Sequence, residues 1–274
     1  MQELSWKNAE GLQLFARHWG VAHPRAVIAM VHGQGEHIGR YAHVAEWFNK
    51  QGIAVLGFDQ QGYGKSEGKR GHALRLDAYL NDIGQLLEET RRLYPGVLLF
   101  LYGHSMGGNL ALNFVLRRHP DIRGLIATGP WIRLAFEAPV LKVMAGRMLR
   151  RFMPSLSLAT GLVAHFISRD PAVVNAYKND PLVHGQVSAS AGIALLEAAS
   201  WLNQFKGPAP VPILLLHGGS DKLTSAPATK ELADRLSGDV THHEWPELYH
   251  EIHNEPEKEV VFNFILDWME ARMK

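Results

Sequence analysis

The chain has 274 residues, of which 46% are hydrophobic, so it is long enough to bury a large core. Its formal net charge is +1, with both signs mixed along the chain, which excludes the basic stripe expected of a nucleic-acid-binding protein. It has no cysteine, which excludes disulfides, thiolate metal ligands and a cysteine nucleophile.

The N-terminal segment Met1–Trp6 has no basic stretch followed by an apolar one, so we expect no signal peptide. No window of about 18 residues is both apolar and free of charge, so we expect no transmembrane helix. These features predict a cytoplasmic protein, and they leave room for a peripheral contact with lipid.

Short apolar runs mark the strands that we expect. The opening segment, with Leu12, Leu14 and Trp19 after Gly11, predicts an antiparallel hairpin at a sheet edge. Five runs follow in chain order: Ala26–Val31, Ile53–Phe58, Val97–Tyr102, Leu125–Ala127 and Ile213–Leu216. Because these runs are apolar on both faces, they predict the central strands of a parallel sheet covered by helices.

Two amphipathic segments predict helices that cover this sheet. Apolar side chains fall on one helical face from Leu76 to Leu87, and again from Val260 to Trp268. Asn254, with Glu257 three residues later, resembles a capping box for the second helix. The alternation of strands and helices predicts an α/β fold with right-handed crossovers.

The middle of the chain breaks this alternation. From about Trp131 to Phe205 there is no strand-like run, and amphipathic helical stretches take its place. We predict a helical cap at residues 131–205, inserted before the strand that carries the catalytic acid. The core would then consist of residues 1–130 and 206–274. The alternative is an ordinary helical layer of the core.

The segment Gly103–Gly107 reads Gly-His-Ser-Met-Gly and matches the G-x-S-x-G pattern of a nucleophile elbow. It follows a buried strand and precedes a predicted helix from Asn109 to Arg117, which is the setting that this motif requires. The tight turn favours glycine two positions before and after the serine. We therefore predict Ser105 as a nucleophile; the alternative is an inert serine in a glycine-rich turn.

A serine hydroxyl needs a base that takes its proton. His250 lies between a short strand-like stretch and the final helix, and Asp221 lies in the loop after the last apolar run. The order Ser105, Asp221, His250 is that of the α/β-hydrolase fold, in which the acid orients the base. His253 is the competing base, and a turn-capping aspartate is the alternative for Asp221.

Two backbone amides are candidates for the oxyanion hole. In this fold one donor follows the nucleophile and the other lies in the loop after an earlier strand. These are Met106 and Gln34, the latter within His32-Gly33-Gln34-Gly35. The alternative is a merely tight glycine turn. A second glycine-rich segment, Asp59–Ser66, lacks the spacing of a phosphate loop, so we interpret it as structural, with Asp59 holding loop amides.

Several motifs together resemble the monoacylglycerol lipase and lysophospholipase family of serine α/β-hydrolases. They are H-G-x-G-E-H-x-x-R-Y at residues 32–41, G-Y-G-K-S-E-G at 62–68, G-H-S-M-G-G at 103–108, D-P-L at 180–182 and Y-H at 249–250. The first of these is much more specific than the others, and the resemblance covers nearly the whole chain. The cap segment and the absence of cysteine depart from the eukaryotic members.

The resemblance implies a cap that shapes an apolar acyl channel and a small polar pocket for a glycerol head group. By position, Glu36, Arg40, Tyr177 and His253 are similar to residues that line or support this pocket. The alternatives are ordinary salt bridges and loop hydrogen bonds. The implied substrate is a single-chain acyl ester, most simply a monoacylglycerol, and the implied chemistry needs neither a metal nor a cofactor.

Methionines at positions 144, 148 and 153 of the predicted cap suit a flexible acyl chain. Its apolar face is also suited to transient contact with membranes or micelles, unless these side chains only pack the cap on the core. Rival functions are a lysophospholipase, a short-chain carboxylesterase and a non-enzymatic binding protein on a hydrolase fold. A dehalogenase on this fold would need an aspartate where Ser105 stands. The oligomeric state is left open by the sequence.

Overall fold

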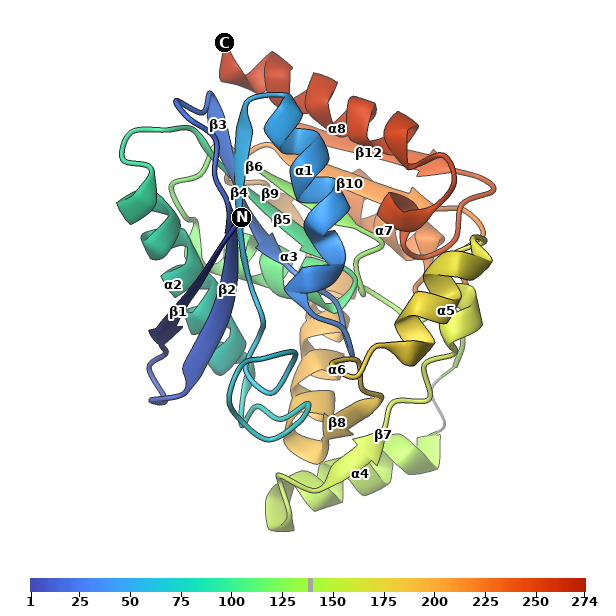
Figure 1. The fold of residues 1–274 in the computed structure, drawn as a ribbon. Coiled ribbons are helices and arrows are strands. Elements are labelled where there is room, and N and C mark those ends of the chain that lie inside the picture. The colour runs from blue at the N-terminus through green and yellow to red at the C-terminus, as the bar shows by residue number, and fades with distance from the viewer. Residues whose placement is uncertain (138–139) are drawn as a thin grey trace.

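The computed structural model describes residues 1–137 and 140–274. Among these residues, eight strands form one twisted sheet with helices on both faces (Figure 1). The strands are β1 (Gln2–Lys7), β2 (Gln13–Trp19), β3 (Ala26–Val31), β4 (Ile53–Phe58), β5 (Leu99–His104), β6 (Gly124–Thr128), β10 (Ile213–Gly218) and β12 (Val240–Trp245).

The spatial order of the strands is β1-β2-β4-β3-β5-β6-β10-β12. The first two strands form an antiparallel hairpin at the edge, and β2 also runs antiparallel to β4. The six strands β4, β3, β5, β6, β10 and β12 are all parallel to one another. Their carboxyl ends therefore meet at one edge of the sheet, where ligands bind in open α/β sheets.

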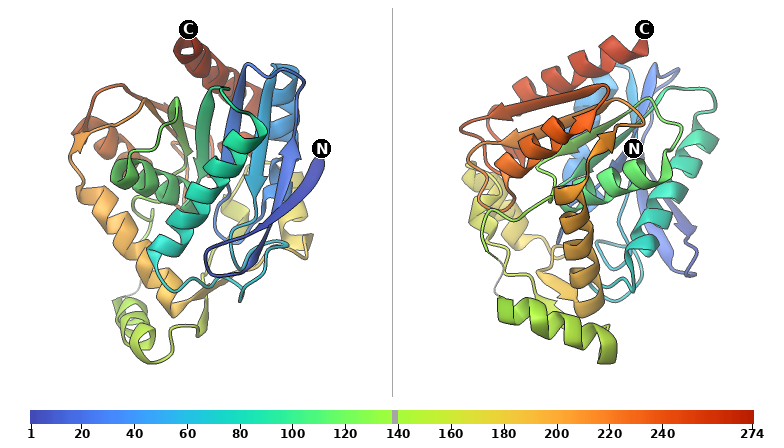
Figure 2. Two further views of the ribbon diagram at one scale, coloured as in Figure 1. Left: turned by 90° about the vertical axis from the view of Figure 1, so that its left-hand side faces the viewer. Right: turned by 180° about the vertical axis from the view of Figure 1, so that it is seen from behind.

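The helices and helical turns are η1 (Ile38–Tyr41), α1 (Ala42–Lys50), α2 (Leu76–Leu93), α3 (Met106–Arg118), α4 (Val140–Phe152), η2 (Ala164–Phe166), α5 (Pro171–Asn179), α6 (Ala189–Gln204), α7 (Ala226–Arg235), η3 (Ile252–Asn254) and α8 (Lys258–Met273). On one face of the sheet, α2, α3, α6 and α7 contribute to a single apolar core. On the other face, α1 and α8 contribute to a second core (Figure 2).

Strand β3 illustrates why both faces are covered. Val27, Ala29 and Val31 belong to the first core, whereas Ala26, Ile28 and Met30 belong to the second. This alternation follows from the pleat, which sends successive side chains to opposite faces. A strand that is apolar at every position is stable only when both of its faces are buried.

The segment between β6 and β10 projects beyond the sheet. It contains α4, α5 and a short antiparallel pair, β7 (Ser157–Ala159) with β8 (Gln186–Ser188) (Figures 1 and 2). Its last helix, α6, packs against α2 and α3 and adds Ala191, Leu195 and Leu202 to the first core. A second small pair, β9 (Gly207–Pro208) with β11 (Leu236–Ser237), follows. Two residues of the predicted cap, 138 and 139, lie outside the described part of the chain.

The predicted parallel sheet, its edge hairpin and its covering helices are confirmed. The expected start of the last helix is wrong: Asn254 ends the turn η3, and α8 begins at Lys258. Glu257, not Asn254, occupies the N-cap position of α8, and the Asn254 side chain donates instead from Nδ2 to Glu251 Oε2 (2.7 Å). We also expected no strand in the middle segment, and this prediction is wrong, because β7 and β8 lie there.

Candidate active site

The turn between β5 and α3 holds Ser105 in a strained conformation. Ser105 has φ +54° and ψ −116°, a region that non-glycine residues rarely adopt. A Cβ on Gly103 would lie 2.4 Å from the carbonyl oxygen of Gly107, and a Cβ on Gly107 would lie 2.3 Å from that of Val31. Glycine is therefore required on both sides, and the turn lifts the serine above the carboxyl edge of the sheet.

The structure brings Ser105, His250 and Asp221 into one hydrogen-bonded chain. The Ser105 hydroxyl lies 2.9 Å from His250 Nε2, and His250 Nδ1 lies 2.7 Å from Asp221 Oδ2. All three residues follow strands at the same sheet edge: β5, β10 and β12. This arrangement lets the imidazole accept the serine proton while the carboxylate holds its tautomer.

The surroundings of these three side chains keep the Asp221 carboxylate ionised and the His250 imidazole basic. Burial alone would raise the pKa of Asp221, but the charge of His250 and hydrogen bonds from His217 and His250 hold it well below its usual range. Burial alone would lower the pKa of His250, yet the Asp221 carboxylate, together with the charges of Glu251 and Glu36, raises it above 6.5.

His104, directly before the nucleophile, is buried against the base. Its ring centroid lies 4.7 Å from that of His250, and its Nδ1 lies 3.1 Å from the carbonyl oxygen of Thr128. Burial, followed by the charge of His250, lowers the pKa of His104 well below its usual range. His104 is therefore neutral at pH 7 and does not compete for the serine proton.

The two candidate oxyanion donors lie beside the serine. Met106 is the first residue of α3, so its N–H has no acceptor within the helix, and the helix dipole favours negative charge there. Gln34 contributes to the wall of the cavity at Ser105. Its side chain is held away by Tyr63, which donates to Oε1 (2.7 Å), and by the carbonyl of Gln186, which accepts from Nε2 (3.0 Å).

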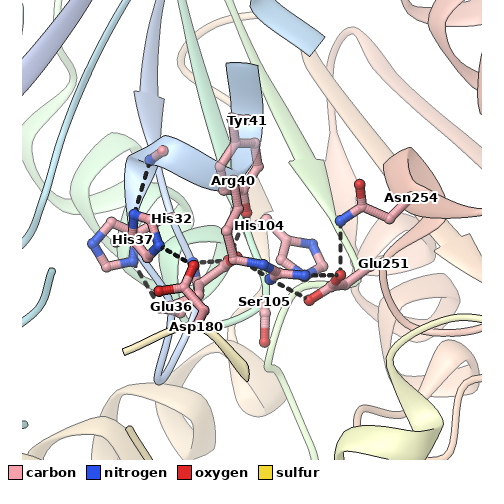
Figure 3. A network of polar contacts seen from close by, with 12 residues as sticks. His32, Glu36, His37, Arg40, Tyr41, His104, Ser105, Asp180, Glu251 and Asn254 are labelled. Atoms are coloured by element: carbon pink, nitrogen blue, oxygen red, sulfur yellow. Dashed lines mark hydrogen bonds and ion pairs between the residues drawn. The ribbon is translucent and has the colours of Figure 1, made fainter. Parts of the chain in front are cut away.

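A buried network of charges fixes the loop after β3 (Figure 3). Arg40 donates to Glu36 Oε2 (2.5 Å) and forms two 2.7 Å bonds with the carboxylate of Glu251. Glu36 also accepts from the Gly33 amide (2.7 Å) and the Tyr41 hydroxyl (2.6 Å). Because Glu251 follows His250 in the chain, this network joins the oxyanion loop to the loop that carries the base.

The four residues expected at a polar head-group pocket have different positions. Glu36 and Tyr177 lie in the cavity wall, whereas Arg40 and His253 do not line it. The Arg40 guanidinium lies 4.8 Å from the centre of the Tyr177 ring. His253 is fully buried and stacks on Tyr41 at 4.9 Å, and neither of its ring nitrogens has a hydrogen-bond partner among the described residues.

The cavity at Ser105 has a volume of about 10 Å³, which is room for one water molecule and not for an acyl chain. Leu162, Ile167 and Tyr177 close it from the segment between β6 and β10. A backbone hydrogen bond also joins this segment to the loop after β3: the His184 amide donates to the Gly35 carbonyl (3.0 Å). In this conformation the cavity is smaller than an acyl ester.

Sequence reasoning missed three residues of the site. His217 and Thr224 both contact the Asp221 carboxylate, and Glu251 holds Arg40. A usable signal was present for His217, since it ends a predicted buried strand four residues before Asp221. Among residues 1–137 and 140–274, no group of three or more His, Asp or Glu side chains is arranged to hold a metal ion.

A mostly parallel sheet covered by helices, with an elbow serine joined to a histidine and an aspartate at its carboxyl edge, defines a serine hydrolase of the α/β-hydrolase fold. A sequence profile of the family described as "Serine aminopeptidase, S33" matches residues 22–257. The monoacylglycerol lipase of Mycolicibacterium smegmatis is 32% identical over 91% of this chain and 90% of that protein. The chain belongs to this S33 family of hydrolases, among the monoacylglycerol lipases.

Two further proteins are similar to this chain. The crystal structure of the Paleococcus ferrophilus monoacylglycerol lipase superposes with a TM-score of 0.85, at 33% identity, over 94% of this chain and 99% of that one. An abhydrolase domain-containing protein of Dictyostelium discoideum is 40% identical over 92% of this chain. The chain spans only 27% of the length of that relative.

Proposed function

We propose that this protein is a serine esterase that hydrolyses monoacylglycerol to glycerol and a fatty acid through an acyl-enzyme on Ser105. The observation that carries the proposal is the unbroken chain from Ser105 through His250 to Asp221, with contacts of 2.9 and 2.7 Å. The family assignment supports the substrate class, since the lipase relatives are matched over most of their length.

The reaction has two halves. Ser105 Oγ attacks the ester carbonyl while His250 Nε2 takes its proton, and the Gln34 and Met106 amides stabilise the oxyanion. His250 then gives the proton to the departing glycerol oxygen, which leaves the acyl group on Ser105. Water attacks the acyl-enzyme with His250 again as the base, and the fatty acid leaves as Ser105 regains its proton.

The cavity wall includes polar groups that suit a small uncharged head group. Glu36 and Tyr177 line it, and we assign them to the glycerol hydroxyls. We assign Arg40 and His253 to the support of this pocket, because Arg40 orients Glu36 and His253 packs beneath Tyr41. The Arg40 guanidinium is already shared by two carboxylates, which disfavours a role in binding the phosphodiester of a lysophospholipid.

We further propose that residues 131–205 act as a cap that opens at a lipid surface. No helix in the described part of the chain is long and apolar enough to cross a membrane. The outer face of α4, however, exposes four large apolar side chains, with relative exposures between 60% and 81%: Leu141, Met144, Met148 and Phe152. Arg147 and Arg151 lie on the same helix and suit anionic lipid head groups.

The decisive experiment is hydrolysis of a substrate panel with Ser105→Ala as the blank. The panel contains monoacylglycerols, diacylglycerols, lysophosphatidylcholine and a short p-nitrophenyl ester. We expect the highest kcat/KM for monoacylglycerols, and a loss of about 10⁴-fold or more in the Ser105→Ala protein with an unchanged circular dichroism spectrum. Cleavage of the activated short ester alone would instead indicate a general carboxylesterase.

A further inference from the structure

A second histidine contacts the carboxylate that orients the base. His217, at the end of β10, is fully buried, and its Nε2 lies 3.0 Å from Asp221 Oδ2. The same oxygen faces His250 Nδ1 (2.7 Å) and accepts from the Thr224 hydroxyl (2.8 Å). Three donors therefore face one carboxylate oxygen, which has two lone pairs to offer them.

The other oxygen of this carboxylate is held by the backbone. Asp221 Oδ1 accepts from the amides of Leu223 (2.7 Å) and Thr224 (3.0 Å). These two bonds fix the direction of the carboxylate without any help from His217. The contact between His217 and Oδ2 is therefore not needed to orient Asp221.

Thr229 fixes the proton on His217. The Thr229 hydroxyl, on α7, lies 2.8 Å from His217 Nδ1. Because Nε2 faces a carboxylate, it carries the ring proton, and Nδ1 then accepts from the hydroxyl. A continuous chain thus runs from Thr229 through His217, Asp221 and His250 to Ser105.

We propose that His217, fixed by Thr229, is a positioning residue that shares Asp221 Oδ2 with His250 and so limits how strongly the carboxylate holds a proton on the base. A hydrogen bond to a carboxylate stabilises its charge and weakens its pull on any other donor. A base held too tightly to its proton would be inactive at neutral pH. This inference rests on the proposed function only for the identity of the nucleophile and base.

Other ionisable groups face the same pair from neighbouring elements. His104 on β5 packs on His250 at 4.7 Å, and further groups face it from the loop after β3 and from the region of η3: Glu36, Arg40, Glu251 and His253. Lys222 lies beside Asp221 in the chain and is placed over the rings of Phe166 and Tyr249. His217 differs from them because it contacts the Asp221 carboxylate directly.

The test is the pH dependence of the rate at which a fluorophosphonate labels Ser105. His217→Leu removes the N–H that donates to Asp221, so Asp221 then holds the His250 proton more tightly. The acid limb of the profile should therefore shift to higher pH by about half to one pH unit. At a fixed pH below the limb, labelling should slow by roughly three- to tenfold, with the high-pH plateau nearly unchanged. His217→Gln keeps an N–H at the position of Nε2 and should restore the wild-type limb.

A second pair of variants tests the same chain from α7. Thr229→Val removes the hydroxyl that fixes the His217 proton and should move the limb in the same direction, whereas Thr229→Ser should not. The proposal is overturned if His217→Leu leaves the limb in place, or if His217→Gln moves it as far as His217→Leu does. A purely structural role would lower Tm and the fraction of labelled protein without moving the limb.

The probe also separates this proposal from the proposed function. A fluorophosphonate carries no glycerol ester, so its reaction reports only on Ser105 and its base. If monoacylglycerol is not cleaved but the limb still moves in His217→Leu, the substrate assignment fails and the role of His217 stands. If monoacylglycerol is cleaved and the limb does not move, the opposite holds.

Discussion

At the scale of single residues, two histidines three positions apart have opposite environments. His250 contacts both Ser105 and Asp221, and the carboxylate raises its pKa. The ring nitrogens of His253 are buried without a hydrogen-bond partner in the described part of the chain, and burial followed by the charge of His104 lowers the pKa of His253 well below the usual range. Of these two histidines, His250 alone has the position and the basicity that our proposal requires of a general base.

This difference predicts unequal effects of substitution. His250→Ala should lower kcat by about 10⁴-fold or more, because the serine loses its base. His253→Phe keeps an aromatic ring against Tyr41 and should change kcat by less than about fivefold. Single-turnover acylation and deacylation rates of both variants would show this. Comparable losses in the two proteins would contradict the assignment of His250 as the base.

For other residues, whether a role could be predicted depended on how specific the local sequence pattern was. Asp59 was expected to hold loop amides, and it accepts from the Ile38 and Lys65 amides at 2.8 Å each. The positions of Ser105, Asp221 and His250 followed from an elbow motif and chain order. Glu251 could not be assigned, because its role depends on Arg40, which is 211 positions away in the chain.

At the scale of secondary-structure elements, the strands that are apolar on both faces were predicted best. Ala26–Val31 and Ile53–Phe58 have the same bounds in the sequence pattern and in β3 and β4. The pair β7–β8 was missed because it consists of three-residue strands with mostly exposed or half-buried side chains. Such strands carry no hydrophobic pattern, and only their pairing across a long loop forms them. The division of the chain at residues 130 and 205 stays a prediction.

Helix α4 supports a prediction about lipid binding. Its outer face carries Met144 and Met148, whereas its inner face packs against α6, where Ile193 approaches Gly146. Replacing both methionines by serine should weaken binding to vesicles of phosphatidylcholine and phosphatidylglycerol by about tenfold, because two apolar side chains lose their burial in lipid.

Co-sedimentation with these vesicles measures the effect, and hydrolysis of a short soluble ester should stay unchanged. The matched control is Val260→Ser, since Val260 is 57% exposed on α8, far from α4 in all three ribbon views (Figures 1 and 2). Equal binding of the double variant and the control would exclude α4 as the lipid-binding face. Binding should also fall as salt screens Arg147 and Arg151.

At the scale of the whole molecule, one buried carboxyl outside the site links stability to pH. Asp82 on α2 is only 2% exposed; its Oδ1 accepts from Asn8 (3.1 Å), and its Oδ2 has no partner among the described residues. Burial raises the pKa of Asp82 from 3.8 to about 7, against the hydrogen bond from Asn8. The folded protein therefore holds this proton up to about pH 7, whereas the unfolded chain releases it near pH 3.8.

Because the folded state binds the extra proton, this group makes the protein less stable as the pH rises from 3.8 to about 7. The cost above pH 7 is at most about 4 kcal/mol, the free energy that corresponds to this shift. Asp82→Asn cannot ionise, so its Tm should exceed that of the wild type by about 5 °C near pH 8.5 and by much less near pH 5. Thermal unfolding at both pH values, with the exposed Asp77→Asn as control, measures this difference. A gain in Tm that is equal at both pH values would mean that Asp82 is ionised in the folded protein throughout this range, with its buried charge stabilised by a partner such as an internal water.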